Sequence, residues 1–189
     1  MRCFLPLLLP AFVLAACSSV VPSSLVSLAA TSPLKADPDA IAVALVVPPG
    51  LAITPGTAEM KIDIARADTG EHRVGRYILI DAPATMMTTA LAPGETLHVY
   101  QLDAKDAQAV RLLQTELAQR ETEVQDGKGS ASLSLGIGGC RVGEGPARNA
   151  TASAFIRTDA AGVFLPLIDQ QPLDSLLGAE ASGTLKPCP

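Results

Sequence analysis

Hydrophobic and polar residues alternate over much of the chain, which predicts a structure built mainly from short β-strands. In residues 59–66, every second residue from Met60 to Ile64 is hydrophobic, and charged residues stand between them. A period of two is typical of a strand that buries one face and exposes the other. The hydrophobic run at 41–47 ends at two prolines and predicts a buried strand. The segments predicted as strands are 41–47, 59–66, 74–81, 96–102, 130–137, 152–158 and 163–168.

The period changes to that of a helix at Asp103. From there to Val124, hydrophobic residues recur at spacings of three, four and seven, which predicts a helix with one buried stripe. Asp103 is the expected N-cap, Glu116 is expected to pair with Arg120, and Gly127 ends the pattern. The stripe consists of Ala107, Val110, Leu113, Leu117 and Val124. We expect it to pack on the sheet of its own domain and the opposite face to be charged and solvated; docking to another protein is the alternative for the stripe.

This order of elements indicates a mainly β (α+β) fold, because no helices alternate with the strands as a parallel sheet requires. We expect one antiparallel β-sandwich-like domain of about seven strands, with one amphipathic helix near 103–124 that covers an open face or edge. The chain has 189 residues, which is enough for one domain, and we expect this domain to occupy residues 39–189.

Turn residues and prolines add detail to the C-terminal part. Residues 159–162 predict a hairpin turn, and Pro166 predicts that the last strand lies at a sheet edge. The glycines of 138–150 predict a loop. Residues 173–177 are expected to form one helical turn.

The first residues have the pattern of a secretory signal. A short basic start, Met1-Arg2, precedes a hydrophobic run at 4–13 that ends in Leu14-Ala15-Ala16-Cys17. The run is shorter than the ~20 apolar residues that a transmembrane helix needs. The sequence therefore predicts a signal peptide at 1–16.

The last four of these residues resemble the lipobox of bacterial lipoprotein precursors, although the resemblance covers residues 1–19 alone. It implies that the chain is cleaved before Cys17 and that acyl chains on this cysteine anchor it to a membrane. Ser18 is typical of lipoproteins sorted to the outer membrane, facing the periplasm. Residues 17–38, rich in Ser, Ala and Pro, would then be the anchor and a flexible tether. The alternative is an ordinary signal peptide in which Cys17 is incidental.

The remaining cysteines fit an oxidising compartment. If Cys3 leaves with the signal and Cys17 carries lipid, Cys140 and Cys188 remain and are expected to form a disulfide. A metal site is the alternative, but no histidine or third cysteine lies near them in the sequence.

Composition excludes one class of partner. The net charge is −5, from 14 basic and 19 acidic residues, so the chain lacks the basic surface that nucleic-acid binding requires. With 48% hydrophobic and 3% aromatic residues, the core must be aliphatic. We expect the acidic body to contact the membrane only through lipid on Cys17. The expected partner is another envelope protein.

Candidate chemistry is sparse. His98 shares a predicted strand face with Thr96 and Tyr100 and follows Glu95, so it is a weak candidate for a base or ligand. His72 lies in a polar turn and is expected to be a surface residue. No serine stands in a motif that would activate it, and no motif indicates a cofactor or a metal.

Three functions fit these features. The first is a non-enzymatic accessory or scaffold lipoprotein that docks to another envelope component. The second is a carrier of a small apolar or lipid-like ligand, which needs a cavity between sheet and helix. The third is an atypical hydrolase, which needs His98 beside a serine or a carboxylate.

Overall fold

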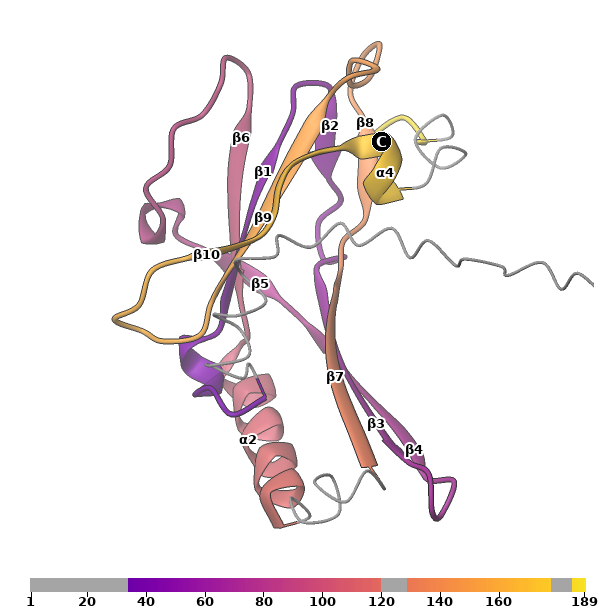
Figure 1. Cartoon of the computed structure of the whole chain (residues 1–189). Coiled ribbons are helices and arrows are strands. Elements are labelled where there is room, and N and C mark those ends of the chain that lie inside the picture. Colours follow the sequence, from indigo (N-terminus) through magenta and orange to yellow (C-terminus); the bar gives the residue numbers. More distant parts are fainter. Residues whose placement is uncertain (1–33, 120–128, 178–184) are drawn as a thin grey trace, which may run out of the picture.

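The computed structural model describes residues 34–119, 129–177 and 185–189, and it shows a mainly antiparallel β fold (Figure 1). Within these residues there are ten strands, two α-helices and two 3-10 turns. The strands are β1 (Ala42–Val47), β2 (Leu51–Ile53), β3 (Glu59–Arg66), β4 (His72–Ile78), β5 (Ile80–Ala82), β6 (Thr96–Gln101), β7 (Gly129–Gly136), β8 (Gly139–Arg141), β9 (Thr151–Arg157) and β10 (Leu165–Pro172). The helical elements are η1 (Pro38–Ala40), η2 (Ala84–Met86), α2 (Ala104–Gln119) and α4 (Leu173–Leu177).

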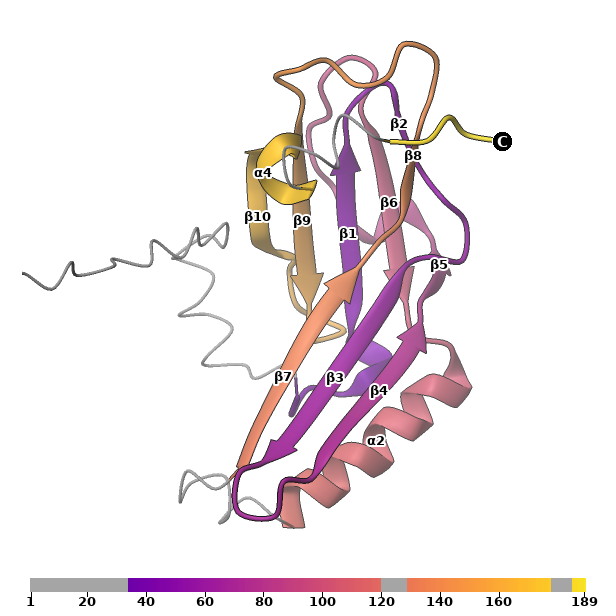
Figure 2. The ribbon, with the colours of Figure 1, turned by 90° about the vertical axis from the view of Figure 1, so that its right-hand side faces the viewer.

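The strands form three sheets. A five-stranded sheet has the order β10-β9-β1-β6-β5, a three-stranded sheet has the order β4-β3-β7, and β2 pairs with β8. Figures 1 and 2 show the three-stranded sheet and α2 side by side in the lower half of the molecule, below the five-stranded sheet. The predicted class, a mainly β sandwich-like fold with one long helix, is confirmed.

The central strand of each larger sheet follows the predicted pattern. In β1, which lies between β6 and β9, Ala42, Val43 and Ala44 are at most 1% exposed, as the continuous hydrophobic run predicts. In β3 the alternating side chains Met60 and Ile62 point inward and are likewise at most 1% exposed. Full burial of a large side chain such as Val43, Met60 or Ile62 stabilises the fold by about 1.5–3 kcal/mol.

The buried stripe of α2 packs on these sheets, as predicted. Ala107 and Val110 are buried in one cluster with residues of both larger sheets. Met60 and Ile62 come from the three-stranded sheet, and Tyr100 comes from the five-stranded sheet. Two further members of the stripe, Leu113 and Leu117, pack partly buried against that cluster. Val124, Arg120 and Gly127 lie outside the described residues.

Asp103 caps α2 as predicted. Its side-chain oxygen Oδ1 accepts a hydrogen bond from the amide of Asp106 at 2.7 Å, and its carbonyl accepts from the amide of Ala107 at 2.8 Å. The cap satisfies one of the amide groups that the first turn of a helix leaves without a partner.

The predicted strand at 74–81 is interrupted, because this segment passes from one sheet to another. β4 ends at Ile78, and the buried residue Leu79 donates its amide hydrogen bond to the carbonyl of Ala58 at 2.8 Å. β5 then joins the five-stranded sheet beside β6. The hydrophobic run at 77–80 continues across the end of β4, so the pattern alone does not mark the change of sheet.

The prediction of a loop over 138–150 is wrong at its start. Gly139–Arg141 forms β8, which pairs antiparallel with β2. The amide of Gly138 donates to the hydroxyl of Thr57 at 3.0 Å, and a Cβ on this glycine would lie 2.9 Å from the same oxygen. Gly138 is needed here because a side chain would collide with Thr57, and not because it makes the chain flexible.

The predicted disulfide between Cys140 and Cys188 is present. It fastens the C-terminal residues along β8: the amide of Arg141 donates to the carbonyl of Lys186 at 2.8 Å, and the amide of Cys188 donates to the carbonyl of Arg141 at 2.9 Å. The C-terminal residues thus lie against one end of the molecule.

The predicted hairpin and edge strand are confirmed near the C-terminus. The amide of Gly162 donates to the carbonyl of Asp159 at 2.9 Å and closes the exposed turn between β9 and β10. β10, which contains Pro166, is an edge strand of the five-stranded sheet.

The packed body extends to the N-terminal side of the predicted boundary at 39. Ala36 is 8% exposed and belongs to the core cluster, and Pro38 is fully buried. The side-chain amide of Gln114 donates to the carbonyl of Ala36 at 2.8 Å, which ties this segment to α2. The predicted signal peptide at 1–16, Cys17 and the tether up to residue 33 lie outside the described residues.

Candidate functional site

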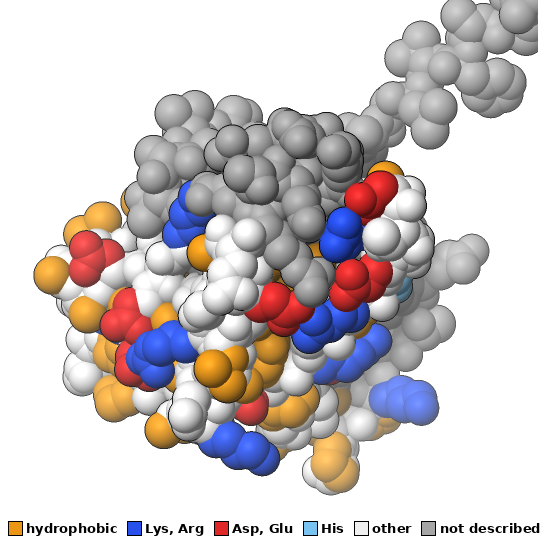
Figure 3. Space-filling view, turned by 90° about the horizontal axis from the view of Figure 1, so that it is seen from below, with side chains coloured by type: hydrophobic (Ala, Val, Ile, Leu, Met, Phe, Trp, Pro, Cys, Tyr) orange, Lys and Arg blue, Asp and Glu red, His pale blue; other side chains and the backbone are white. Residues whose placement is uncertain are grey.

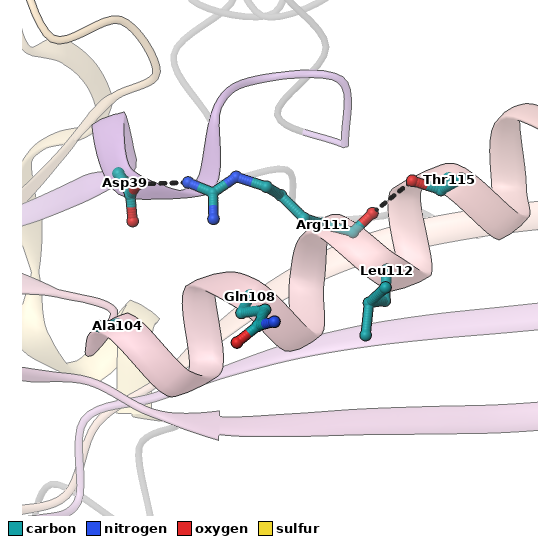
Figure 4. A pocket seen from close by; sticks show the side chains of 6 residues that line it. All are labelled: Asp39, Ala104, Gln108, Arg111, Leu112 and Thr115. Carbon is teal, nitrogen blue, oxygen red and sulfur yellow. Dashed lines mark hydrogen bonds and ion pairs between the residues drawn. The ribbon is translucent and has the colours of Figure 1, made fainter.

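The outward-facing side of α2 carries an open groove of about 470 Å³, with η1 on its other side (Figure 4). Leu112 stands in it with 67% of its surface exposed. The groove is lined by Asp39, Ala104, Gln108, Arg111, Leu112 and Thr115.

Four of the five helix residues that line this groove are uncharged and Arg111 is the fifth, so the predicted outer face is solvated and only partly charged. Ala104, Gln108, Leu112 and Thr115 follow one another at spacings of four and three, so they share one side of the helix. Lys105 is exposed beside this row.

Two of the other charges on α2 are held at its sides. Arg111 donates to the carboxylates of Asp37 (3.0 Å) and Asp39, while Glu116 accepts from Arg73 at 2.6 Å. Glu116 was expected to pair with Arg120, which the structure does not describe. These ion pairs hold the two charges toward η1 and β4, beside the uncharged row of helix residues that faces the groove.

The Arg111 cluster holds η1 against α2. A hydrogen bond from the amide of Asp39 lowers the pKa of the Asp37 carboxyl, and the guanidinium of Arg111 lowers it further. The same two aspartates raise the pKa of Arg111. All three side chains are exposed, so solvent screens their attraction, and the contacts act mainly to set the position of η1 on α2. Figure 3 shows this lower end of the molecule, where hydrophobic side chains lie exposed between acidic and basic ones.

His98 lies on β6 with the neighbours that the strand pattern predicts. Its Nε2 is 3.1 Å from the Oγ1 of Thr96, and its ring stacks on Tyr100 with centroids 6.4 Å apart. Burial raises the pKa of the Tyr100 phenol, and the negative charge of Asp81 adds to the effect.

The structure does not bring Glu95 to His98. The carboxylate of Glu95 accepts instead from the amide of Ala92 at 2.7 Å and closes the turn before β6. Within the described part of the chain, His98 has no hydrogen bond to a serine or a carboxylate. This geometry gives His98 no orienting acid of the kind that a catalytic base uses.

The other titratable candidates have structural roles. His72 is exposed, as predicted, and its Nε2 lies 3.0 Å from both carboxylate oxygens of Asp63 on the neighbouring strand. Asp103 is the cap of α2. Among residues 34–119, 129–177 and 185–189, no three His, Cys, Asp or Glu side chains are grouped so that they could hold a metal ion.

None of the helices in the described ranges is long and apolar enough to cross a membrane.

The groove was not predicted, although part of its signal is present in the sequence. The spacing of Ala104, Gln108 and Leu112 could have shown an uncharged row opposite the buried stripe. The partners of Arg111 lie more than 70 positions earlier in the chain, so their effect on this surface could not be foreseen from the helix alone.

Comparison of the chain with protein-family models, with curated proteins and with solved structures found no match.

Proposed function

We propose that the protein is a membrane-anchored envelope lipoprotein that acts as a non-enzymatic accessory or scaffold subunit and docks to another envelope protein through the groove on α2. In this proposal the chain is cleaved before Cys17, acylated there, and held at the outer membrane facing the periplasm. The resemblance of residues 14–17 to a lipobox supports the anchor, and the disulfide supports an oxidising compartment.

The observation that carries the docking role is the position of Leu112. A leucine with two thirds of its surface in water is the centre of an uncharged helix row, beside charges that are already paired with the protein itself. Covering this side chain would contribute about 1–2 kcal/mol to binding. An amphipathic helix of the partner suits the groove, because residues spaced by four and three form the ridges that a second helix packs against.

The alternative of a ligand carrier gains no support from the space between α2 and the sheets. The side chains described there belong to one core cluster, which includes Met60, Ile62 and Val110, each at most 1% exposed. For the hydrolase alternative, Thr96 is the one side chain among the described residues that hydrogen-bonds His98.

The docking role is tested by crosslinking in cells, followed by purification of the tagged full-length protein and mass spectrometry. We expect the wild type to capture one partner protein in a constant ratio to itself. We expect the Leu112→Glu variant not to capture this partner. The matched control is Val142→Glu, because Val142 is 51% exposed and directly follows β8, which Figures 1 and 2 show at the end of the molecule opposite α2. Retention of the partner by Leu112→Glu, or capture of no partner by the wild type, would overturn the docking role.

The anchor is tested separately by metabolic labelling with palmitate and by membrane fractionation. We expect Cys17→Ser to lose both the label and processing of the precursor, and Cys3→Ser to keep both, since Cys3 lies within the predicted signal peptide. A labelled Cys17→Ser protein would overturn the lipid anchor while leaving the docking result unaffected.

A further inference from the structure

The two larger sheets end in four edge strands, and one of them lacks the features that usually prevent pairing with another chain. β10 carries Pro166, two shifts of register and a positive φ of 45° at Gln170. β4 carries Arg73 and Arg76, and α2 runs alongside it (Figure 2). Proline, irregular backbone, charge and a covering helix all protect sheet edges. β5 is only three residues long.

β7 has none of these features. Its sequence, Gly-Ser-Ala-Ser-Leu-Ser-Leu-Gly, spans eight residues without a charge or a proline. It pairs with β3 in unbroken register from Gly129 to Gly136. Among the residues that the structure describes, no strand pairs with its other side, so the outward amide and carbonyl groups of β7 have no backbone partner there.

The two faces of β7 differ, because one is polar and exposed and the other is hydrophobic and partly buried. Ser132 and Ser134 are exposed on the outer face of the sheet. On the inner face, Ala131, Leu133 and Leu135 pack against the core but remain only partly buried. A strand added beside β7 would cover the exposed part of these three side chains.

The sequence of β7 is complementary to itself in antiparallel orientation. With Leu133 opposite its own copy, Ala131 stands opposite Leu135 and Ser132 stands opposite Ser134. Small side chains then meet large ones on the inner face, and serines, which can hydrogen-bond across strands, meet on the outer face. No like charges meet along the strand.

We propose that β7 is a self-association surface: it pairs antiparallel with β7 of a second copy of this chain in the register centred on Leu133. The product is a continuous six-stranded sheet with a two-fold axis at Leu133, in which each subunit uses the same surface. The inference goes beyond the proposed function, because it uses neither the groove on α2 nor the lipid.

The register is tested with two differently tagged forms of the full-length chain expressed in the same cells. One form carries Ser132→Cys and the other carries Ser134→Cys, since the register places these positions opposite each other. We expect a mixed disulfide on a non-reducing gel, at least about tenfold more abundant than with the control pair Ser132→Cys and Ser175→Cys. Ser175 is exposed on α4, outside the sheet edge.

A second variant tests whether the strand edge itself is required. Ser132→Lys places a charge on β7 opposite Asp63, so its own sheet accommodates the lysine, whereas two copies bring two lysines close to the two-fold axis. We expect this variant to keep the circular-dichroism spectrum of the wild type and to self-associate at least about tenfold more weakly by analytical ultracentrifugation in detergent.

Crosslinking of the Ser132→Cys and Ser134→Cys pair no stronger than that of the control would overturn the proposal. An unchanged association of Ser132→Lys would also overturn it. If β7 instead crosslinked to a different protein, the edge would be a docking site for that protein and not for a second copy.

Discussion

Removing the crosslink between Cys140 and Cys188 should lower the free energy of unfolding by about 4 kcal/mol at 25 °C. The two cysteines are 48 positions apart, and the loop that they close in the unfolded chain loses about 14 cal/mol/K of entropy. The loop contains β9 and β10, so the crosslink restricts the unfolded chain over two neighbouring strands of the five-stranded sheet.

The variant that isolates the crosslink is Cys188→Ala. Cys140 is 9% exposed and lies in β8, so its replacement would also leave a small cavity. Cys188 is more exposed, so Cys188→Ala and reduced wild-type protein should have nearly equal stability, and Cys140→Ala should be less stable than both.

The assay is urea unfolding of residues 34–189, followed by circular dichroism, for the oxidised, reduced and Cys188→Ala forms. With a denaturant slope of about 1–3 kcal/mol/M, the midpoint should fall by about 1.3–4 M urea. If the oxidised and reduced forms differed by less than about 1 kcal/mol, the entropy argument would fail for this loop. The unfolded chain would then already hold these cysteines close together.

Two further predictions concern the helix cap and the tyrosines. Asp103→Ala should lower the free energy of unfolding by about 1 kcal/mol, because it removes the hydrogen bond from the Asp106 amide. Asp103→Asn should keep most of the wild-type stability, because its side-chain oxygen can accept the same hydrogen bond. Equal stability of the two variants in urea would contradict the capping role. Burial raises the pKa of both Tyr77 and Tyr100 above the ordinary value of 10, with Asp106 and Asp81 adding to the effect, so folding favours the neutral phenols. This stabilisation is complete below the pKa of the unfolded chain and is lost as pH rises through the folded pKa values. Near-ultraviolet titration of these two tyrosines, the only ones in the chain, should therefore show ionisation at higher pH in the folded protein than in urea, and coincident curves would refute it.

The parts of the fold that could be predicted depend on contacts between residues close in sequence. Burial of Met60 and Ile62, packing of Val110 and the cap at Asp103 all follow from the period of the pattern or from a cap one turn away. The disulfide followed from the cysteine count and the compartment.

The parts that were missed depend on distant segments. β2 and β8 have three residues each, too few for a period to be visible, and each becomes a strand only because the other lies beside it. The break between β4 and β5 was missed because the hydrophobic run at 77–80 continues across it. The groove on α2 depends on Arg111 turning toward η1, which its sequence neighbours do not reveal. His98 and Glu95 are close in sequence, but the carboxylate closes a turn and the ring lies on a strand face, so proximity along the chain did not predict a shared site.

The exposed turn between β9 and β10 has a consequence for proteolysis. It lies between Cys140 and Cys188, so a protease that cuts within residues 159–162 produces two polypeptides that remain covalently joined. β10 would also remain hydrogen-bonded to β9. Covalent joining keeps the effective concentration of the severed piece high, and the strand re-forms its place in the sheet faster than it can diffuse away. A cut at this turn would thus pass unnoticed on a non-reducing gel and become visible only after reduction.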